Sequence, residues 1–588
     1  MTVCFVLLQL ARFACYWSLR DRLGAMPLTA IAKCWLLGLR FDASATAMVV
    51  SLPTLMLALP FPVRWYRVWW RAWHGVACAG LLVLALACIA DYYYLAEVRR
   101  HIGQEVLTVA NDMGFIEAFA IGPAKWGLLL LVFAATSICW GYVAIVKRGQ
   151  RRMPFLQALL ILLTMGIAVR GSVGDKPLSA IDAFDVGNYE LTQLELNGAF
   201  SMARALDRGM PAVSQGEFES ALAHLKYAPE QPFARHANSG ERRNVVIFLL
   251  ESWSASYVDA FRSDQPLGVT PVMDQLAHDG VVFSQFYAAG QRSYEGIQAV
   301  LAGLPALPGV PTLTEGLSLR TSRLGDLASK QGIRTIFTQA SPRRSLRLDS
   351  VAEALGFSEY YGREDNSRLL LNYADVDAFT FGLDHETMQG LADRLHDERK
   401  PFLAFLFSGS THTPVAPIPA ELQSHYSPTH PDKDFLDAMH YSDWGIGQFM
   451  ARARTEPWFD NTVFIFLADH TRGNDRDLRA RFHIPMVIYA PKIFSHRVDT
   501  RIGSQVDIFD TVVDLLGLEA DYSSAGHSLL AAPVQERVTM RSGENIGLVT
   551  PDRCFMYTTL QADDSEAKYL AAYRSVLYGV IQRNSWAE

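Results

Sequence analysis

The chain has few charged residues and no basic excess. Charged residues make up 19% of its 588 residues, whereas hydrophobic residues make up 50%. Disordered and fibrous chains are poor in apolar side chains, so this composition excludes both classes. The formal net charge of -7 argues against a nucleic-acid-binding protein, because affinity for phosphate backbones requires a basic surface. We therefore expect a lipid or a neutral polymer as partner, and no nucleic acid.

Cysteine is almost absent from the second half of the chain. Of the seven cysteines only Cys554 lies after residue 150, which excludes a disulfide framework there. Cys554 alone does not identify the compartment, because exported bacterial domains often lack disulfides and cytosolic ones do too. The sequence also lacks internal repeats and low-complexity tracts. The compartment must therefore be inferred from membrane topology.

Long apolar runs fill the first 170 residues. Five of them are candidate transmembrane helices: residues 1–19, 43–62, 72–90, 126–146 and 153–169. The second and fourth runs carry no charge and are long enough to cross about 30 Å of hydrocarbon. The first is weaker because Arg12 interrupts it, and it fits a cleavable signal peptide badly because no basic segment precedes it. We predict a bundle of five transmembrane helices rather than buried helices of a soluble protein.

The basic residues near these runs set the predicted orientation. Two clusters, at 147–152 and 64–71, both lie in the cytoplasm if the chain starts inside and crosses five times. Everything after about residue 170 is then extracytoplasmic. Residues 20–41 fit this less well, because they form a predicted outside loop that carries four basic residues around an apolar centre at 34–39. That centre is a candidate for dipping into the membrane.

The rest of the chain alternates between apolar runs and helical patterns. Residues 171–243 are polar and form a predicted connector with an amphipathic helix near 188–206. Predicted buried parallel strands follow at 244–250, 333–338, 402–407, 462–467 and 485–489. Predicted helices lie between them at 294–304, 324–331, 385–395 and 437–455. This order predicts an α/β sheet with helices on both faces.

Polar residues follow three of the predicted strands directly. In open α/β sheets ligands bind beyond the carboxyl ends of the strands, so these positions are candidate site residues. Glu251 follows the first strand, Asp469 and His470 follow the fourth, and His412 lies in the segment after the third. Carboxylates and imidazole are suitable ligands for Mn²⁺, Mg²⁺ or Zn²⁺.

Ser293 lies immediately before an apolar helical stretch. Amide N–H groups at a helix start bind phosphate groups readily, and a divalent cation would favour the serine alkoxide as a nucleophile. Each residue also has a purely structural interpretation: Ser293 as a helix cap, Glu251 as a solvated strand end, Asp469 as a turn residue and His412 as a loop histidine. Their common placement at strand ends and a helix start favours function.

Several segments together resemble the lipoteichoic acid synthase and phosphoglycerol transferase family, membrane-anchored members of the alkaline phosphatase–sulfatase superfamily. The resemblance covers nearly the whole length. Its most specific segments are NVVIFLLESWSASYVD, FSQFYAAGQRSYEGIQAVLAGLPALPG, FGLDHETM, SGSTHTP, FLADHTRG, HIPMVIYAP and SQVDIFDTVVDLLG. It implies a transmembrane domain at 1–170, a connector at 171–243 and an extracytoplasmic, sulfatase-like catalytic domain at 244–588, with a mixed, mostly parallel sheet sandwiched by helices.

The resemblance also implies roles for particular residues. Glu251, Ser293, Asp469 and His470 would bind one divalent metal ion, Mn²⁺ in the first place, with Mg²⁺ or Zn²⁺ as alternatives. His412 would contact the phosphoglycerol substrate, and two further substrate contacts would be Phe381 and His483. The chain departs from the family at the nucleophile, where family members often have threonine and this sequence has Ser293.

The implied function is transfer of glycerol phosphate from a phosphatidylglycerol-like lipid to a glycan or polymer of the cell envelope, through a phosphoglyceryl-serine intermediate. The place would be the bacterial cytoplasmic (inner) membrane, with the catalytic domain on the periplasmic side. A sulfatase is disfavoured because Ser293-Tyr294-Glu295-Gly296-Ile297 lacks the Pro and Arg of a formylglycine motif. Phosphoethanolamine transferases usually carry several disulfides that Cys554 cannot form. The alternatives are such a transferase, a phosphodiesterase or phosphatase, and a non-catalytic, membrane-tethered lipid- or glycan-binding protein.

Overall fold

The computed structural model describes most of the chain. The described residues are 2–23, 26–59, 62–98, 101–102, 137–138, 141–143, 155–172, 177–179, 182–183, 189–205, 212–263, 265–310, 319–367, 369, 382–412, 415, 418–423, 430–473, 475, 477–532, 536–543, 545–556 and 564–586. They form two compact units, Met1–Ala212 with Gln582–Asn584, and Val213–Ile581 with Ser585–Glu588. The predicted domain boundaries at 170 and 243 stay a prediction.

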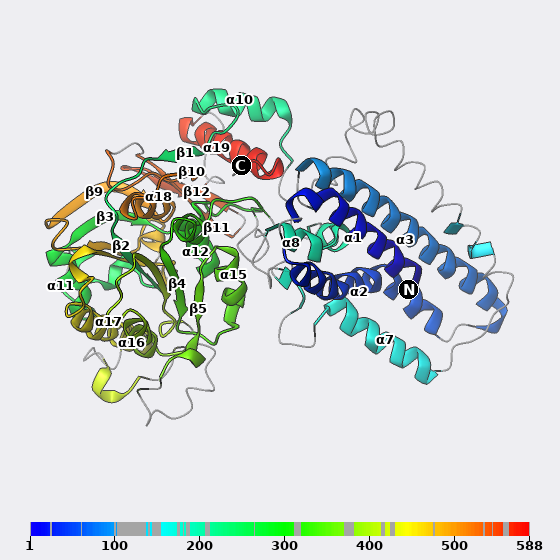
Figure 1. Ribbon diagram of the computed structural model, residues 1–588, viewed down its shortest axis with the longest axis horizontal. Helices are drawn as coiled ribbons and strands as arrows, with labels where there is room; N and C mark the ends of the chain where they lie inside the picture. Colours follow the sequence, from blue (N-terminus) through cyan, green and yellow to red (C-terminus); the bar gives the residue numbers. More distant parts are fainter. Residues whose placement is uncertain are drawn as a thin grey trace. The chain divides into compact units, whose positions relative to one another are not determined.

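The first unit is helical. Its helices are α1 (Thr2–Leu23), α2 (Leu28–Ala58), α3 (Val63–Val98), α7 (Phe155–Arg170), α8 (Tyr189–Glu195) and α9 (Gly198–Ala205), coloured blue to cyan in Figure 1. Within the described residues, three helices are long and apolar enough to cross a membrane, namely α1, α2 and α3, and α7 is a shorter apolar helix. The fourth predicted run, 126–146, lies largely outside the described residues. Among the described residues there are thus three candidate spans, where the sequence predicts five over residues 1–170.

The predicted loop at 20–41 is wrong over most of its length, because α2 already begins at Leu28. One of its basic residues, Arg40, is paired within the first unit. The Arg40 guanidinium lies 2.7 Å from the Glu195 carboxylate, whose side chain is fully buried. Pairing of this kind lets a charged residue lie in an otherwise apolar helix.

Arg12, which interrupts the first apolar run, has a buried counter-charge. Its guanidinium lies 2.6 Å from a carboxylate oxygen of Asp42, and both side chains have no exposed surface. The same guanidinium also donates hydrogen bonds to the backbone carbonyls of Leu194, Glu195 and Leu196 at the end of α8. A buried arginine with all these acceptors is compatible with a transmembrane helix.

The predicted amphipathic helix at 188–206 is present as two helices, α8 and α9. Asn197 separates them, because its side-chain oxygen accepts a hydrogen bond from the Phe200 amide at 2.8 Å and so begins a new helix. Its amide nitrogen also donates to Asp42 at 2.8 Å. A tertiary contact of the connector thus explains the break.

The second unit is built on an eight-stranded sheet, as predicted for an α/β protein. The strands are β2 (Asn244–Leu250), β3 (Val281–Tyr287), β4 (Arg334–Gln339), β5 (Glu359–Tyr361), β6 (Phe402–Phe407), β7 (Thr462–Ala468), β8 (Met486–Tyr489) and β9 (Arg497–Ser504). Their order is β5-β4-β6-β2-β7-β8-β3-β9. Strand β8 runs antiparallel to both of its neighbours, which corrects its prediction as a parallel strand. The other pairings are parallel, so the sheet is mixed and mostly parallel.

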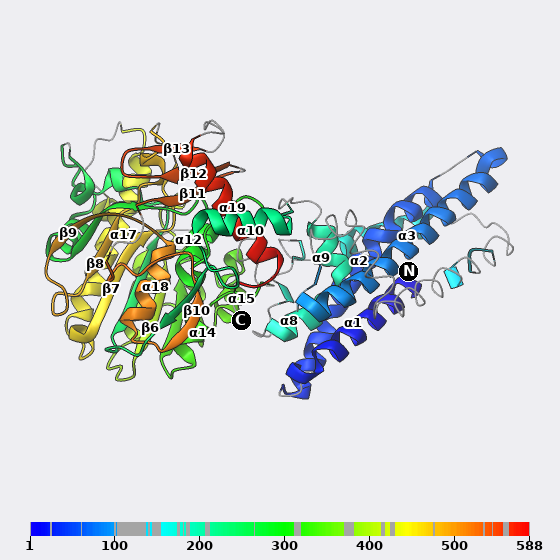
Figure 2. The ribbon, with the colours of Figure 1, turned by 90° about the horizontal axis from the view of Figure 1, so that it is seen from above.

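Helices cover both faces of this sheet (Figures 1 and 2). They are α11 (Pro271–Asp279), α12 (Ser293–Ala302), α14 (Leu324–Ser329), α15 (Leu348–Ala354), α16 (Asp384–Arg394), α17 (Lys433–Ala453) and α18 (Val506–Leu515). Helix α12 packs on α18, and α16 packs on α17. The central strands β2 and β7 are buried along their whole length, which explains their uninterrupted apolar sequences.

Smaller elements complete the second unit. Strands β1 (Ala234–Ala237) and β10 (Ala520–Ser523) form an antiparallel pair. Strands β11 (Val538–Ser542), β12 (Asn545–Val549) and β13 (Cys554–Met556) form an antiparallel sheet. Helix α10 (Gln215–Leu225) precedes β1, and α19 (Ser565–Gln582) follows β13.

Candidate active site

Strands β2 and β7 bring three predicted site residues to the same sheet edge. The two strands are adjacent and parallel, and their register pairs Leu250 with Ala468. Glu251 and Asp469 follow directly and are therefore neighbours. One ligand atom each from Glu251, Asp469 and His470 lies within 4.8 Å of the others. Residues more than 200 positions apart in sequence are thus placed side by side by strand pairing.

Ser293 joins this cluster from the start of helix α12. It is the first residue of α12, and its hydroxyl donates a hydrogen bond to the Glu251 carboxylate at 3.2 Å. The same Oγ atom lies 3.4 Å from Nε2 of His470. The four side chains predicted to share a metal ion therefore lie together.

The start of α12 is held close to Asp469. Glu295 accepts hydrogen bonds from the backbone amides of Gln291 and Arg292, at 2.8 and 3.1 Å, which fixes the turn before Ser293. Gly296 allows the close approach, because a Cβ atom there would lie 2.5 Å from the carbonyl oxygen of Asp469. Only glycine fits this contact without displacing the backbone.

The cluster concentrates negative charge in a buried place. Burial, together with the nearby Asp469 carboxylate, raises the pKa of Glu251 to about 7. Burial alone would favour a neutral imidazole, but Asp469 and Glu251 outweigh it and raise the pKa of His470. A cation among these groups would relieve the repulsion between the two carboxylates.

The donor atoms fit a divalent metal ion. Among the described residues, the buried Oδ2 atom of Asp469 has no hydrogen-bond partner. Nδ1 of His470 lies 2.7 Å from the carbonyl oxygen of Thr471, which makes Nδ1 the donor and leaves Nε2 with a lone pair toward the cluster. Carboxylate, hydroxyl and imidazole donors together suit Mn²⁺, Mg²⁺ or Zn²⁺.

The part of the chain that carries these residues matches a known family. Residues 243–518 match the sulfatase family. This part of the chain is a sulfatase-like domain. The match confirms the superfamily predicted from the sequence segments, and the curated relatives confirm the resemblance to phosphoglycerol transferases and lipoteichoic acid synthases.

Two of these relatives are distant in sequence. Phosphoglycerol transferase I of Citrobacter koseri is 23% identical over 323 residues, which cover 53% of this chain and 42% of that protein. The lipoteichoic acid synthase-like protein YvgJ of Bacillus subtilis is 20% identical over 374 residues, 58% of this chain and 59% of that protein. The chain thus matches about half the length of each relative.

Solved structures show the same fold for the sulfatase domain. A protein of the alkaline phosphatase superfamily from Vibrio parahaemolyticus has a TM-score of 0.54 at 23% identity, covering 64% of this chain and 98% of that one. The lipoteichoic acid synthase LtaP from Listeria monocytogenes has a TM-score of 0.50 at 18% identity, covering 63% and 98%.

Hydroxyl side chains of the sulfatase domain hold Glu251 in place. The Glu251 amide donates to Oγ of Ser408 at 2.8 Å, and the Thr411 hydroxyl donates to the Glu251 carbonyl. Ser252 donates to the Glu251 carboxylate at 2.7 Å and adopts a left-handed backbone conformation, with φ of 61°. Sequence reasoning missed these three supporting roles, although all three residues lie within four positions of the end of a predicted strand.

The segment after β6 carries His412. Asp384, which is fully buried, accepts hydrogen bonds from the amides of Gly409 at 2.6 Å and Ser410 at 3.1 Å. This fixes the turn, and the His412 amide donates to the Gly409 carbonyl at 3.0 Å. His412 is close enough to Glu251 for a positive charge on its ring to lower the pKa of that carboxyl.

Of the two remaining predicted substrate contacts, the structure describes only His483. Phe381 lies outside the described residues. Nε2 of His483 lies 3.0 Å from the carbonyl oxygen of Ser284 in β3, and its ring packs on Tyr287 with centroids 5.4 Å apart. His483 therefore ties β3 to the segment before β8, and its predicted contact with substrate stays a prediction.

Proposed function

We propose that this protein is a membrane-anchored phosphoglycerol transferase that uses Ser293 as its nucleophile. The observation that carries the proposal is the position of the Ser293 hydroxyl, at a helix N-terminus and 3.2 Å from Glu251 and 3.4 Å from His470. A hydroxyl among metal-binding donors at the N-terminus of a helix is arranged for attack on a phosphorus atom. The names of the curated relatives favour phosphoglycerol as the transferred group.

The donor proposed is a phosphatidylglycerol-like lipid. A divalent cation, with Mn²⁺ as the first candidate, would be held by Glu251, Ser293, Asp469 and His470. It would lower the pKa of the Ser293 hydroxyl and neutralise charge on the phosphoryl oxygens. The Ser293 hydroxyl proton points at the Glu251 carboxylate, to which it is hydrogen-bonded. Ser293 Oγ forms a bond to phosphorus, the bond to the lipid oxygen breaks, and diacylglycerol leaves as the alcohol after taking up a proton.

The second step reverses the first. A hydroxyl group of a cell-envelope glycan or polymer attacks the phosphorus of the phosphoglyceryl-serine, and Ser293 Oγ leaves and regains a proton. His412 would orient the glycerol phosphate or move a proton at the attacking oxygen. The N-terminal amides of α12 would stabilise the negative charge that develops on the phosphoryl group.

The apolar helices fit this chemistry. The donor lipid does not leave the bilayer, so tethering the sulfatase domain raises the effective donor concentration. The three candidate spans among the described residues support a membrane location. The proposed membrane is the bacterial cytoplasmic membrane, with the sulfatase domain on its extracytoplasmic side.

The test uses the purified full-length protein with fluorescent phosphatidylglycerol and Mn²⁺. The Ser293→Ala variant should release no diacylglycerol, whereas Ser293→Thr keeps the hydroxyl and should retain activity. Unchanged release by Ser293→Ala would remove Ser293 from the nucleophile's role. Mass analysis with added glycans then separates a transferase from a hydrolase, and a phosphatidylethanolamine arm identifies the head group.

A further inference from the structure

Gln505, which is not one of the predicted site residues, contacts both the end of β7 and the turn that leads to Ser293. Gln505 lies between β9 and α18 and has no exposed surface. Its side-chain nitrogen donates hydrogen bonds to the backbone carbonyls of Ala468 and Asp469, both at 2.7 Å. Its side-chain oxygen accepts a hydrogen bond from the Ala289 amide at 2.9 Å. Both N–H donors and the acceptor of this amide are therefore used.

These partners belong to two segments that no strand pairing joins directly. Ala468 and Asp469 form the end of β7, where the aspartate and the following histidine are predicted metal ligands. Ala289 lies after β3, at the start of the turn that leads to Ser293. In the sheet order β8 separates β7 from β3, and the β7–β8 ladder ends at Leu467. The Gln505 amide thus spans a gap that strand pairing leaves open.

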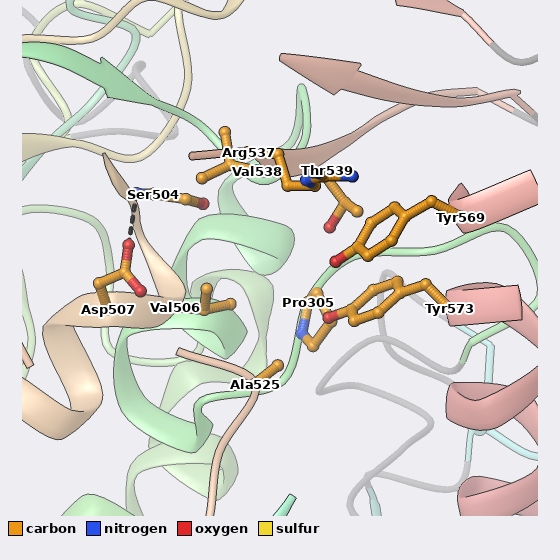
Figure 3. Close-up of a pocket in the computed structure, with 10 residues that line it drawn as sticks. All are labelled: Pro305, Ser504, Val506, Asp507, Ala525, Arg537, Val538, Thr539, Tyr569 and Tyr573. Carbon is orange, nitrogen blue, oxygen red and sulfur yellow. Dashed lines mark hydrogen bonds between the residues drawn. The ribbon is translucent and has the colours of Figure 1, made fainter. Parts of the chain in front are cut away.

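The backbone around Gln505 is itself fixed. Asp507 accepts hydrogen bonds from the Ser504 amide at 2.8 Å and from the His527 amide at 2.9 Å, and Figure 3 shows the first of them beside a small pocket. Val506 packs in an apolar cluster with Ala289, Ala299 and Ala306, so it contacts the nucleophile turn and α12. The residues before and after Gln505 are thus both fixed, which leaves its backbone little freedom to move.

We infer that Gln505 is a positioning residue that sets the distance between the Ser293 nucleophile and the Asp469–His470 pair. The inference rests on the proposed function, in which these groups act on one phosphorus atom. Attack requires Ser293 Oγ and the metal-binding groups in one geometry, and a displacement of about 1 Å costs on the order of 100-fold in rate. Two hydrogen bonds to the end of β7 and one to the nucleophile turn oppose such a displacement.

Two substitutions separate the hydrogen bonds from the packing. Gln505→Met keeps the side-chain length but removes all three bonds. Gln505→Glu keeps the acceptor for Ala289 but, when ionised, loses both donors to the β7 carbonyls. Both variants should lower kcat by about 10- to 100-fold, with KM for the lipid within about twofold of the parent value.

The matched control is a buried amide at the opposite end of the same sheet. Asn244 bridges three strands there, because its side chain donates to Thr462 Oγ1 at 3.3 Å and accepts from the Phe402 amide at 3.2 Å. Asn244→Leu should lower the melting temperature, as the Gln505 variants do, but leave kcat unchanged. A general loss of stability therefore lowers the melting temperature of all three variants. A positioning effect lowers kcat only in the two Gln505 variants.

The measurements are kcat and KM for diacylglycerol release, the melting temperature, and the Mn²⁺ affinity by calorimetry. The melting temperature and the Mn²⁺ affinity establish that each variant is folded. Parent-like kcat in folded Gln505→Met, or an equal loss of kcat in Asn244→Leu, overturns the inference. If the parent protein releases no diacylglycerol, the proposed function fails, and the same comparison with bis(p-nitrophenyl) phosphate as substrate decides the role of Gln505.

Discussion

Metal binding at this site should depend strongly on pH, because protons and the cation compete for the same atoms. In the metal-free protein the pKa of Glu251 is raised to about 7, by burial and by the Asp469 carboxylate. Below that value Glu251 carries a proton, which must leave before its oxygens bind a cation. Lowering the pH therefore weakens binding, and raising it strengthens binding.

The magnitude follows from this pKa. The fraction of ionised Glu251 falls from about nine-tenths at pH 8 to about one-tenth at pH 6, so the apparent Kd for Mn²⁺ should rise about tenfold. His470 adds to the effect in the same direction, because its pKa is also raised and its Nε2 must be unprotonated to bind metal. About tenfold is thus the lower bound over this range.

The assay is calorimetric titration of the metal-free protein with Mn²⁺ at pH 6, 7 and 8, in two buffers that differ in ionisation enthalpy. The buffer difference reports the number of protons released per metal ion. Glu251→Gln removes the titrating carboxyl, so its weaker binding should depend less on pH than that of the parent. Equal affinities at pH 6 and 8, or the same pH dependence in Glu251→Gln, would refute the reasoning.

Four further outcomes are expected. Glu295→Gln weakens the acceptor for two turn amides and should reduce kcat for diacylglycerol release severalfold in steady-state assays. Gly296→Ala places a methyl group against Asp469, which should destabilise the protein by about 1–3 kcal/mol and weaken Mn²⁺ binding in calorimetry. Arg12→Met leaves Asp42 buried without its cation and should cost about 3–5 kcal/mol by thermal unfolding in detergent, partly recovered by adding Asp42→Asn. Chelation of the metal should lower the melting temperature more at pH 8 than at pH 6, since only ionised Glu251 repels Asp469.

Apolar periodicity predicted much of the sheet. Strands β2, β6 and β7 were found because both of their faces are buried, which gives uninterrupted apolar runs. Strand β9 was missed because it is an edge strand with exposed, charged positions such as Arg497, and its pattern resembles a loop. The antiparallel direction of β8 was missed because burial is independent of strand direction.

The cluster around Ser293 was predictable for a similar reason. Its members directly follow strands or begin a helix, so their places in the sequence and the resemblance to a known family pointed to them. Ser408 also follows a predicted strand, but sequence alone does not show that it binds the Glu251 amide. Gln505 gave no such signal, because it binds backbone groups of other segments, and those partners are known only from the folded chain. The Arg12–Asp42 pair was missed likewise, since sequence alone does not show that two charges in apolar helices meet.

The central claim is that Ser293 carries the phosphoglyceryl group between donor and acceptor. The most direct measurement is peptide mass spectrometry of the protein after incubation with phosphatidylglycerol and Mn²⁺ in the absence of acceptor, stopped by acid. The account predicts a phosphoglycerol adduct on the peptide that contains Ser293, and none when Ser293 is replaced by alanine. An adduct on another residue, or sustained turnover by Ser293→Ala, would contradict it.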